Sequence, residues 1–160
     1  MLGITILAVG TVKEKYLSDA LKEYLKRIGA YASVRVTECK EEHLPDRPSP
    51  AEIRAAVERE GTRILDSIPR RAYVCALCIE GAECSSEAFA KRLETLASDG
   101  CSEIVFIIGG SDGLSDAVKK RADWRLSFSP MTFPHQLMRV ILAEQLYRAL
   151  NIRNGGKYHK

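Results

Sequence analysis

Residues 103–113, EIVFIIGGSDG, combine an apolar run with a glycine-rich turn. The run shows no alternation of polar and apolar residues, which is typical of a strand buried on both faces of a parallel sheet. A second run of this kind, AYVCALCI, occupies residues 72–79. Two such strands predict the centre of a parallel sheet. Ligands of such sheets bind beyond the carboxyl ends of the strands.

Strand and helix patterns alternate along the rest of the chain. The segment Ser49-Pro50-Ala51-Glu52 is a capping box with proline at the first helical position. Together with apolar spacing, this predicts strands at 2–9, 34–37, 72–79, 103–108 and 124–128, and helices at 16–28, 50–68, 86–99, 115–122 and 134–152. We therefore expect an α/β fold in which residues 1–160 form one domain, with helices on both faces of a mostly parallel sheet.

Composition excludes several classes of protein. The 160 residues are 46% hydrophobic and 28% charged, which argues against disorder and against a disulfide scaffold. No apolar run approaches the roughly 18 residues that a membrane span needs. The apolar start, MLGITILAVG, has no basic flank and no small-residue cleavage site, so it predicts a strand. We expect a cytoplasmic protein with reduced cysteines and no membrane partner.

Cys75 and Cys78 form a C-x-x-C pair, a spacing found in metal and redox sites. The pair falls within a predicted strand, where residues three apart point to opposite faces. The two thiols could not converge on one ion. We interpret them as small buried side chains and expect no metal site.

Charge is unevenly distributed along the chain. Residues 117–160 carry nine Lys or Arg and two acidic residues, a formal charge of +7. Residues 1–116 carry 15 basic and 19 acidic residues, a formal charge of −4. A basic C-terminal quarter indicates either a surface that faces a polyanion or a solvated helix.

Three segments could carry chemistry. Gly109-Gly110-Ser111-Asp112-Gly113 follows a predicted buried strand, but it matches neither the dinucleotide fingerprint nor a Walker phosphate loop. It is either a tight turn or one wall of a ligand site. Residues 126–135, LSFSPMTFPH, place backbone polar groups beside apolar side chains, which suits a flat purine ring or a stiff connector. The tail at 153–160 places cations, a tyrosine and a histidine around two glycines, a composition that could bind phosphate and stack on a base.

The ordered set IIGGSDG, LSFSPMTFPHQLMRVILAEQLYRA and a final GGKYHK resembles the ribosomal RNA large subunit methyltransferase H family of the SPOUT superfamily. The starting strand ILAVGTVKEKY and the SPAEIR helix fit the same family, so the resemblance covers essentially the full length. It implies a C-terminal trefoil knot and a homodimer. It also implies S-adenosylmethionine as methyl donor and N3 of a pseudouridine in 23S rRNA, within the assembled ribosome, as the methylated atom.

The resemblance also implies a set of site residues. The cofactor would be held by Leu77, Gly109, Gly110, Phe128, Ser129, Pro130, Met131, Thr132 and Phe133. We hypothesise that His159 assists loss of the N3 proton, that Tyr158 stacks on or orients the base, and that Arg153 stabilises the developing anion.

Two other functions are compatible with the residues. One is a different nucleotide-binding enzyme, such as a hydrolase, although the phosphate-loop and dinucleotide fingerprints are missing. The other is a ribosome-binding factor without catalytic activity. A lone histidine at the start of a helix, His135, is more often structural than catalytic.

Overall fold

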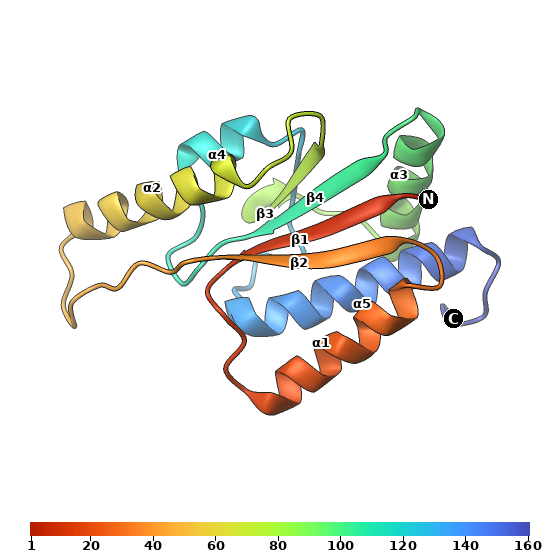
Figure 1. Cartoon of the computed structure of the whole chain (residues 1–160), viewed down its shortest axis with the longest axis horizontal. Helices are drawn as coiled ribbons and strands as arrows, with labels where there is room; N and C mark the ends of the chain where they lie inside the picture. The colour runs from red at the N-terminus through yellow and green to blue at the C-terminus, as the bar shows by residue number, and fades with distance from the viewer.

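The computed structural model describes residues 1–160 and contains one sheet of five strands. The strands follow the order β2-β1-β4-β3-β5, and every neighbouring pair is parallel, which confirms the predicted sheet (Figure 1). Their bounds are β1 Gly3–Val9, β2 Ser33–Cys39, β3 Tyr73–Ala82, β4 Glu103–Ile108 and β5 Trp124–Leu126. The helices are α1 Lys15–Ile28, α2 Pro50–Asp66, α3 Ser86–Ser98, α4 Asp116–Arg121 and α5 His135–Arg153.

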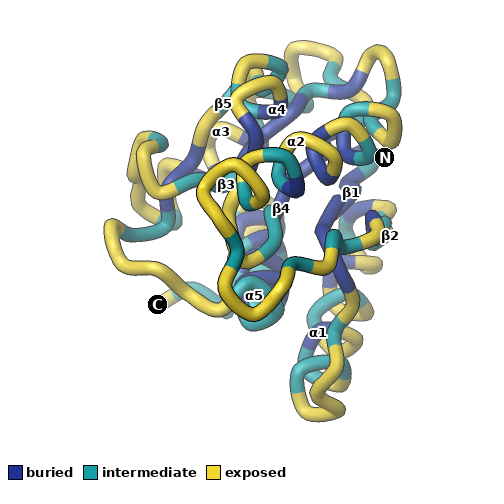
Figure 2. The backbone as a smooth tube through the Cα atoms, turned by 90° about the vertical axis from the view of Figure 1, so that its left-hand side faces the viewer, coloured by how far each residue is buried: buried dark blue, intermediate teal, exposed yellow.

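Helices cover both faces of the sheet, as the alternating pattern predicted. Helices α1, α3 and α5 pack on one face around the larger core cluster, which includes Ile28, Phe89 and Leu142. Helices α2 and α4 pack on the other face, where Ile64 and Val118 meet the sheet. The buried residues lie mainly in the strands and in parts of the helices, and they form two core clusters (Figure 2). None of the five helices has the length and apolar character to cross a bilayer.

Serine side chains cap the start of three of the five helices, α2, α3 and α4. The Ser49 hydroxyl accepts a hydrogen bond from the Glu52 backbone N–H, and the Glu52 carboxylate accepts one from the Ser49 backbone N–H, so the predicted capping box is confirmed. The Ser85 hydroxyl caps the start of α3 by accepting a hydrogen bond from the Ala88 backbone N–H. Helix α2 ends at Asp66, two residues before the predicted end.

Strand β3 differs from its prediction. It continues to Ala82, three residues beyond the expected end, and its second half is not buried on both faces. Ile79 is 52% exposed. The reason is that β3 pairs with β4 only through Ala76, so the later residues have no neighbour on that side. The protruding end of β3 therefore forms part of the molecular surface.

Arg139, on α5, is the largest fully buried side chain, with 1% of its surface exposed. Its guanidinium donates hydrogen bonds to the carbonyl oxygens of Gly10 at 2.7 Å and Val9 at 3.3 Å, and pairs with the Glu38 carboxylate at 2.5 Å. These groups lie at the carboxyl ends of β1 and β2. Arg139 thus attaches the first turns of α5 to the edge of the sheet where ligands are expected.

We predict that Arg139→Met lowers the free energy of unfolding by about 3 kcal/mol, because buried carbonyl groups and Glu38 lose a charged donor. Urea unfolding followed by circular dichroism measures the change. Arg54→Met, at an exposed position of α2, is the matched control and should change stability little. Equal stability of the two variants would show that Arg139 does not hold the helix in place.

Candidate cofactor site

A cavity of about 730 Å³ lies beyond the carboxyl ends of β3 and β4. Three segments build its walls: the end of β3, the glycine turn after β4, and the loop that joins β5 to α5. Of the nine predicted cofactor residues, only Pro130 does not line the cavity. The eight that do are Leu77, Gly109, Gly110, Phe128, Ser129, Met131, Thr132 and Phe133. The structure thus brings together segments separated by about 50 positions in the sequence.

The glycine turn is shaped by close backbone contacts. Gly110 and Gly113 form an isolated antiparallel bridge, and the Gly113 N–H donates to the Gly110 carbonyl at 3.1 Å. Gly113 has a φ of 83°, which L side chains rarely adopt. A Cβ at Gly109 would lie 2.8 Å from the Gly113 carbonyl oxygen. The turn therefore needs glycine at Gly109 and Gly113.

The loop after β5 is ordered by its own serines. The Ser127 hydroxyl donates to the Ser129 carbonyl at 3.1 Å, and the Ser129 hydroxyl accepts from the Met131 N–H at 3.0 Å. Met131 and Phe133 are nevertheless 73% and 38% exposed. Two large apolar side chains thus remain at the cavity mouth, where a ligand or another chain could cover them.

Several cavity residues were not predicted from the sequence. Ile79 and Glu80 line the cavity because β3 extends further than expected, and Lys119, on α4, pairs with Glu80. His135 and Met138 enter from the first turn of α5. The place of His135 at the end of the segment 126–135 is a sequence signal that could have included it among the cofactor residues. Lys119 carried no such signal, since its helix is placed by tertiary packing.

The two cysteines of the C-x-x-C pair have different surroundings. Cys75 is part of the larger core cluster, and burial raises the pKa of its thiol well above the usual value. Cys78 is half-buried and lines the cavity. No group of three His, Cys, Asp or Glu side chains is arranged to hold a metal ion.

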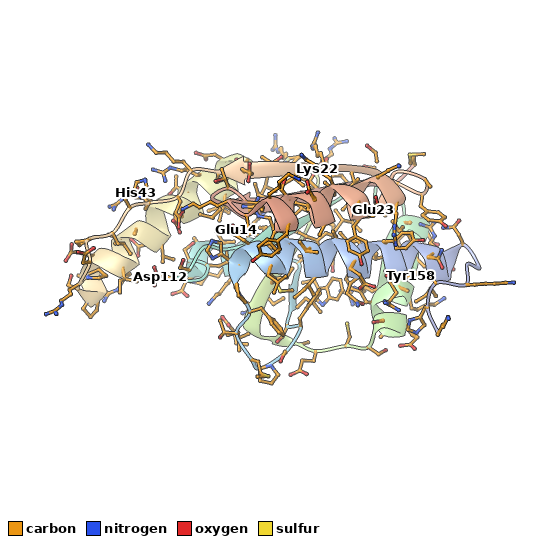
Figure 3. The ribbon with its side chains drawn as sticks, turned by 90° about the horizontal axis from the view of Figure 1, so that it is seen from below. Glu14, Lys22, Glu23, His43, Asp112 and Tyr158 are labelled. Atoms are coloured by element: carbon orange, nitrogen blue, oxygen red, sulfur yellow. The ribbon has the colours of Figure 1, made fainter.

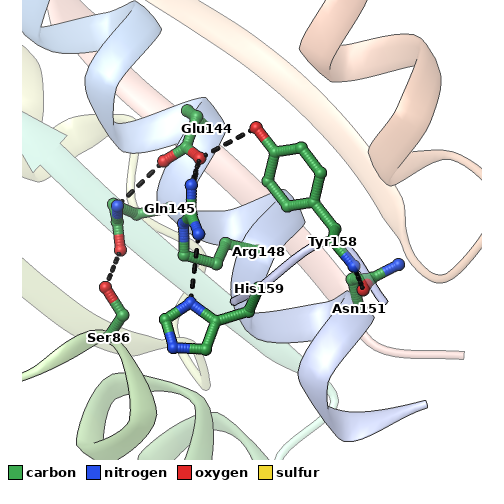
Figure 4. A network of polar contacts seen from close by, with 7 residues as sticks. All are labelled: Ser86, Glu144, Gln145, Arg148, Asn151, Tyr158 and His159. Atoms are coloured by element: carbon green, nitrogen blue, oxygen red, sulfur yellow. Dashed lines mark hydrogen bonds and ion pairs between the residues drawn. The ribbon is translucent and has the colours of Figure 1, made fainter. Parts of the chain in front are cut away.

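The tail folds back against the side of α5. The Tyr158 hydroxyl donates to the Glu144 carboxylate at 3.0 Å, and the Tyr158 backbone N–H donates to the Asn151 side chain (Figure 4). Arg148 pairs with the same carboxylate at 2.5 Å and lies over the Tyr158 ring. Burial and hydrogen bonds with Tyr24 and Glu144 raise the pKa of Tyr158 to about 12, so its phenol stays protonated at neutral pH.

His159 is held through both ring nitrogens. Arg148 lies 3.0 Å from Nδ1, and because a guanidinium can only donate, Nδ1 must accept. Nε2 then carries the proton and donates to Glu87, on α3, at 2.8 Å. In this docked position His159 has no free nitrogen with which to take a proton from a substrate.

The tail and the cavity lie at opposite ends of α5. His135 and Asn151 are 16 positions apart on the helix, a separation of about 24 Å. Asp112 lies near the first turn of α5 and Tyr158 near its far end (Figure 3). Tyr158, His159 and Arg153, the three predicted catalytic residues, therefore do not reach the cavity of their own chain.

The positive charge of residues 117–160 is less available than its sum suggests. Arg139 is buried, and Lys119, Arg121 and Arg148 are paired with Glu80, Asp123 and Glu144. Five basic residues remain exposed without an ion pair: Lys120, Arg125, Arg153, Lys157 and Lys160. Three of the five belong to the end of α5 and the tail. The basic surface that could face a polyanion is therefore smaller than the charge of residues 117–160 suggests.

Comparison with known proteins identifies the family. A family model described as predicted SPOUT methyltransferase matches residues 2–159. This chain belongs to the SPOUT methyltransferases. It is 52% identical to the ribosomal RNA large subunit methyltransferase H of Bacillus cytotoxicus over 99% of this chain and 100% of the relative. The protein of that name from Ligilactobacillus salivarius is 50% identical over the same shares.

A solved structure also shares the fold of this SPOUT methyltransferase. A probable methylase family protein from Haemophilus influenzae superimposes with a TM-score of 0.52 at 9% sequence identity. The match covers 99% of this chain and 70% of the other. At this identity the likeness concerns the fold alone.

Family membership confirms S-adenosylmethionine as the cofactor. The cavity fits this molecule, because its volume is within the range of about 300–1,000 Å³ for small-molecule sites. Phe128, Met131 and Phe133 offer apolar surface to a planar purine. Glu80 and Asp112 bring carboxylates to a cofactor that carries a positively charged sulfur.

Gly109→Ala should weaken the binding of S-adenosylmethionine about tenfold to a hundredfold. The added Cβ would displace the Gly113 carbonyl and move one wall of the cavity. Isothermal titration calorimetry measures the affinity, and thermal melting verifies that the variant is folded. Ser102→Ala, at the opposite end of β4, serves as the control. A folded Gly109→Ala protein with unchanged affinity would remove the glycine turn from the cofactor site.

Proposed function

We propose that this protein transfers a methyl group from S-adenosylmethionine to N3 of a pseudouridine in 23S rRNA of the assembled ribosome. The observation that carries the proposal is the single cavity formed by eight of the residues expected to hold the cofactor. The names of the full-length relatives, which are at least 50% identical, support ribosomal RNA as the substrate. The proposed setting is the cytoplasm.

Positioning is the main contribution of the cavity. The bound cofactor supplies an electrophilic methyl group on a sulfonium, and transfer is an in-line displacement. The turn Gly109–Gly113 and the loop around Ser129 would hold the cofactor and restrict its orientation. As N3 of the base attacks the methyl carbon, the electrons of the sulfur–carbon bond remain on sulfur. The N3 proton passes to a base on the protein.

The tail supplies that base in our proposal. His159 would accept the N3 proton, which requires it to leave Arg148 and Glu87. Tyr158 would stack on or orient the base through a protonated phenol, in keeping with its raised pKa. Arg153, exposed and unpaired, would stabilise the negative charge that develops on the ring. The target base must leave its stack to reach the donor.

A homodimer reconciles the position of the tail with this chemistry. The tail of one chain lies too far from the cavity of that chain, so a complete site needs the tail of a second copy. Met131 and Phe133, exposed at the cavity mouth, offer apolar surface for such a contact. The trefoil knot that the family resemblance implies also remains part of this proposal.

We expect His159→Ala to slow methyl transfer about a hundredfold or more, and Tyr158→Phe to slow it less, while both leave cofactor affinity unchanged. Transfer of labelled methyl from S-adenosylmethionine to ribosomes that lack the modification measures the rate. Lys91→Ala, exposed on α3, is the control. Wild-type rates for both variants would exclude the assigned roles. Ribosome binding without any methyl transfer by the unaltered protein would favour a non-catalytic factor.

Mixed dimers test the sharing of the site. At a cofactor concentration below the dissociation constant of the unaltered protein, chains with Gly109→Ala and chains with His159→Ala should each keep about a tenth of the wild-type rate or less, and should recover about one quarter of it when mixed. Half of randomly assembled dimers are mixed, and each mixed dimer holds one complete site of two. A mixture that stays inactive, although the chains exchange, would show that each cavity uses its own tail.

A further inference from the structure

A second cavity, of about 270 Å³, lies behind the glycine turn. Ser111 and Asp112 line both cavities, so the glycine turn lies between them. Three glutamates, Glu41, Glu42 and Glu60, also line the second cavity. The proposed chemistry gives no role to this group.

Glu60 is the buried member of the group. It lies on α2, 7% of its surface is exposed, and its Oε2 accepts the Glu42 backbone N–H at 2.9 Å. Its Oε1 faces the turn, 3.5 Å from the position that a Cβ at Gly110 would take. Gly110 has no side chain, so only backbone stands between the Glu60 carboxyl and the cofactor cavity.

We propose that Glu60 is a specificity-determining residue, whose negative charge acts through the Gly110 turn to favour S-adenosylmethionine over the demethylated product. The inference rests on the proposed cofactor cavity and deepens it. S-adenosylmethionine and S-adenosylhomocysteine share adenine, ribose and amino-acid groups, but only the first carries a sulfonium cation. A fixed carboxylate close to the cavity therefore stabilises the methyl donor selectively, and it assists release of the product.

Burial makes the charge of Glu60 both effective and dependent on pH. Burial raises the pKa of Glu60, and the nearby carboxylates of Glu41, Asp112 and Glu42 raise it further, while the Glu42 N–H lowers it. Lys13 and His43 also line the second cavity, and Arg59 and Arg63 reach it through their pairs with Glu42. The ionised form favours a cationic ligand, so selectivity for the methyl donor should rise as the pH rises through the pKa of Glu60.

Glu60→Gln removes the charge and keeps an oxygen that can accept the Glu42 N–H. We expect the affinity for S-adenosylmethionine to fall about threefold to tenfold at pH 8 or above, with the affinity for S-adenosylhomocysteine unchanged. Calorimetric titration of both ligands across about pH 5 to pH 9 gives the ratio of the two affinities. In the unaltered protein the ratio should rise with pH, and in Glu60→Gln it should be flat. Glu58→Gln, exposed on the same helix, should behave as the unaltered protein.

The ratio separates an electrostatic role from a structural one. If Glu60 only supported the shape of the turn, both ligands would weaken together and the ratio would stay as in the unaltered protein, which would overturn the inference. Loss of stability should not complicate the test. Because the folded state raises the pKa of Glu60, its ionised form opposes folding above the pKa of the unfolded chain, and glutamine removes that cost. An unaltered protein that binds neither ligand would instead refute the cofactor cavity itself.

Discussion

The buried guanidinium of Arg139 is the interaction on which the arrangement of the site depends. It connects α5 to the ends of β1 and β2 through two backbone carbonyls and Glu38. The neighbouring Gln136 side chain accepts the Lys13 backbone N–H and attaches the chain after β1 to the same turn of the helix. Since the cavity loop leads directly into α5, the position of this helix sets the position of the loop. A buried charge without hydrogen-bonding partners is costly, so α5 has one favourable position on the sheet, in which Arg139 keeps its partners.

The cavity itself depends on the absence of side chains in a short turn. Gly109 and Gly113 allow the chain to fold back on itself within five residues. Gly110 then exposes bare backbone to a cofactor on one side and to Glu60 on the other. The same turn that permits close approach of a ligand also transmits the electric field of Glu60 behind it. Shape and electrostatics thus have a common origin in the glycine turn.

The tail, unlike the two loops, does not contribute to the cavity of its own chain. Tyr158 is hydrogen-bonded to Glu144, and His159 is hydrogen-bonded to Arg148 on α5 and to Glu87 on α3. These contacts lie far from the cavity of the same chain. They hold the tail against α5 and α3. In the proposed dimer, a second chain would bring its tail to the cavity and would add surface for a large substrate to a chain of 160 residues.

Sequence by itself determined the order of strands and helices, the capping box at Ser49, and the two loops that line the cavity. These features are local, because apolar periodicity, glycine and serine caps act over a few residues. Only the tertiary structure decided the rest. It showed that Arg139 is buried, that β3 extends past its neighbours, and that Glu60 lies behind Gly110. It also separated the tail from the cavity. Each of these features depends on contacts between residues far apart in the chain. The local sequence pattern around an arginine is the same whether its side chain faces solvent, RNA or the core.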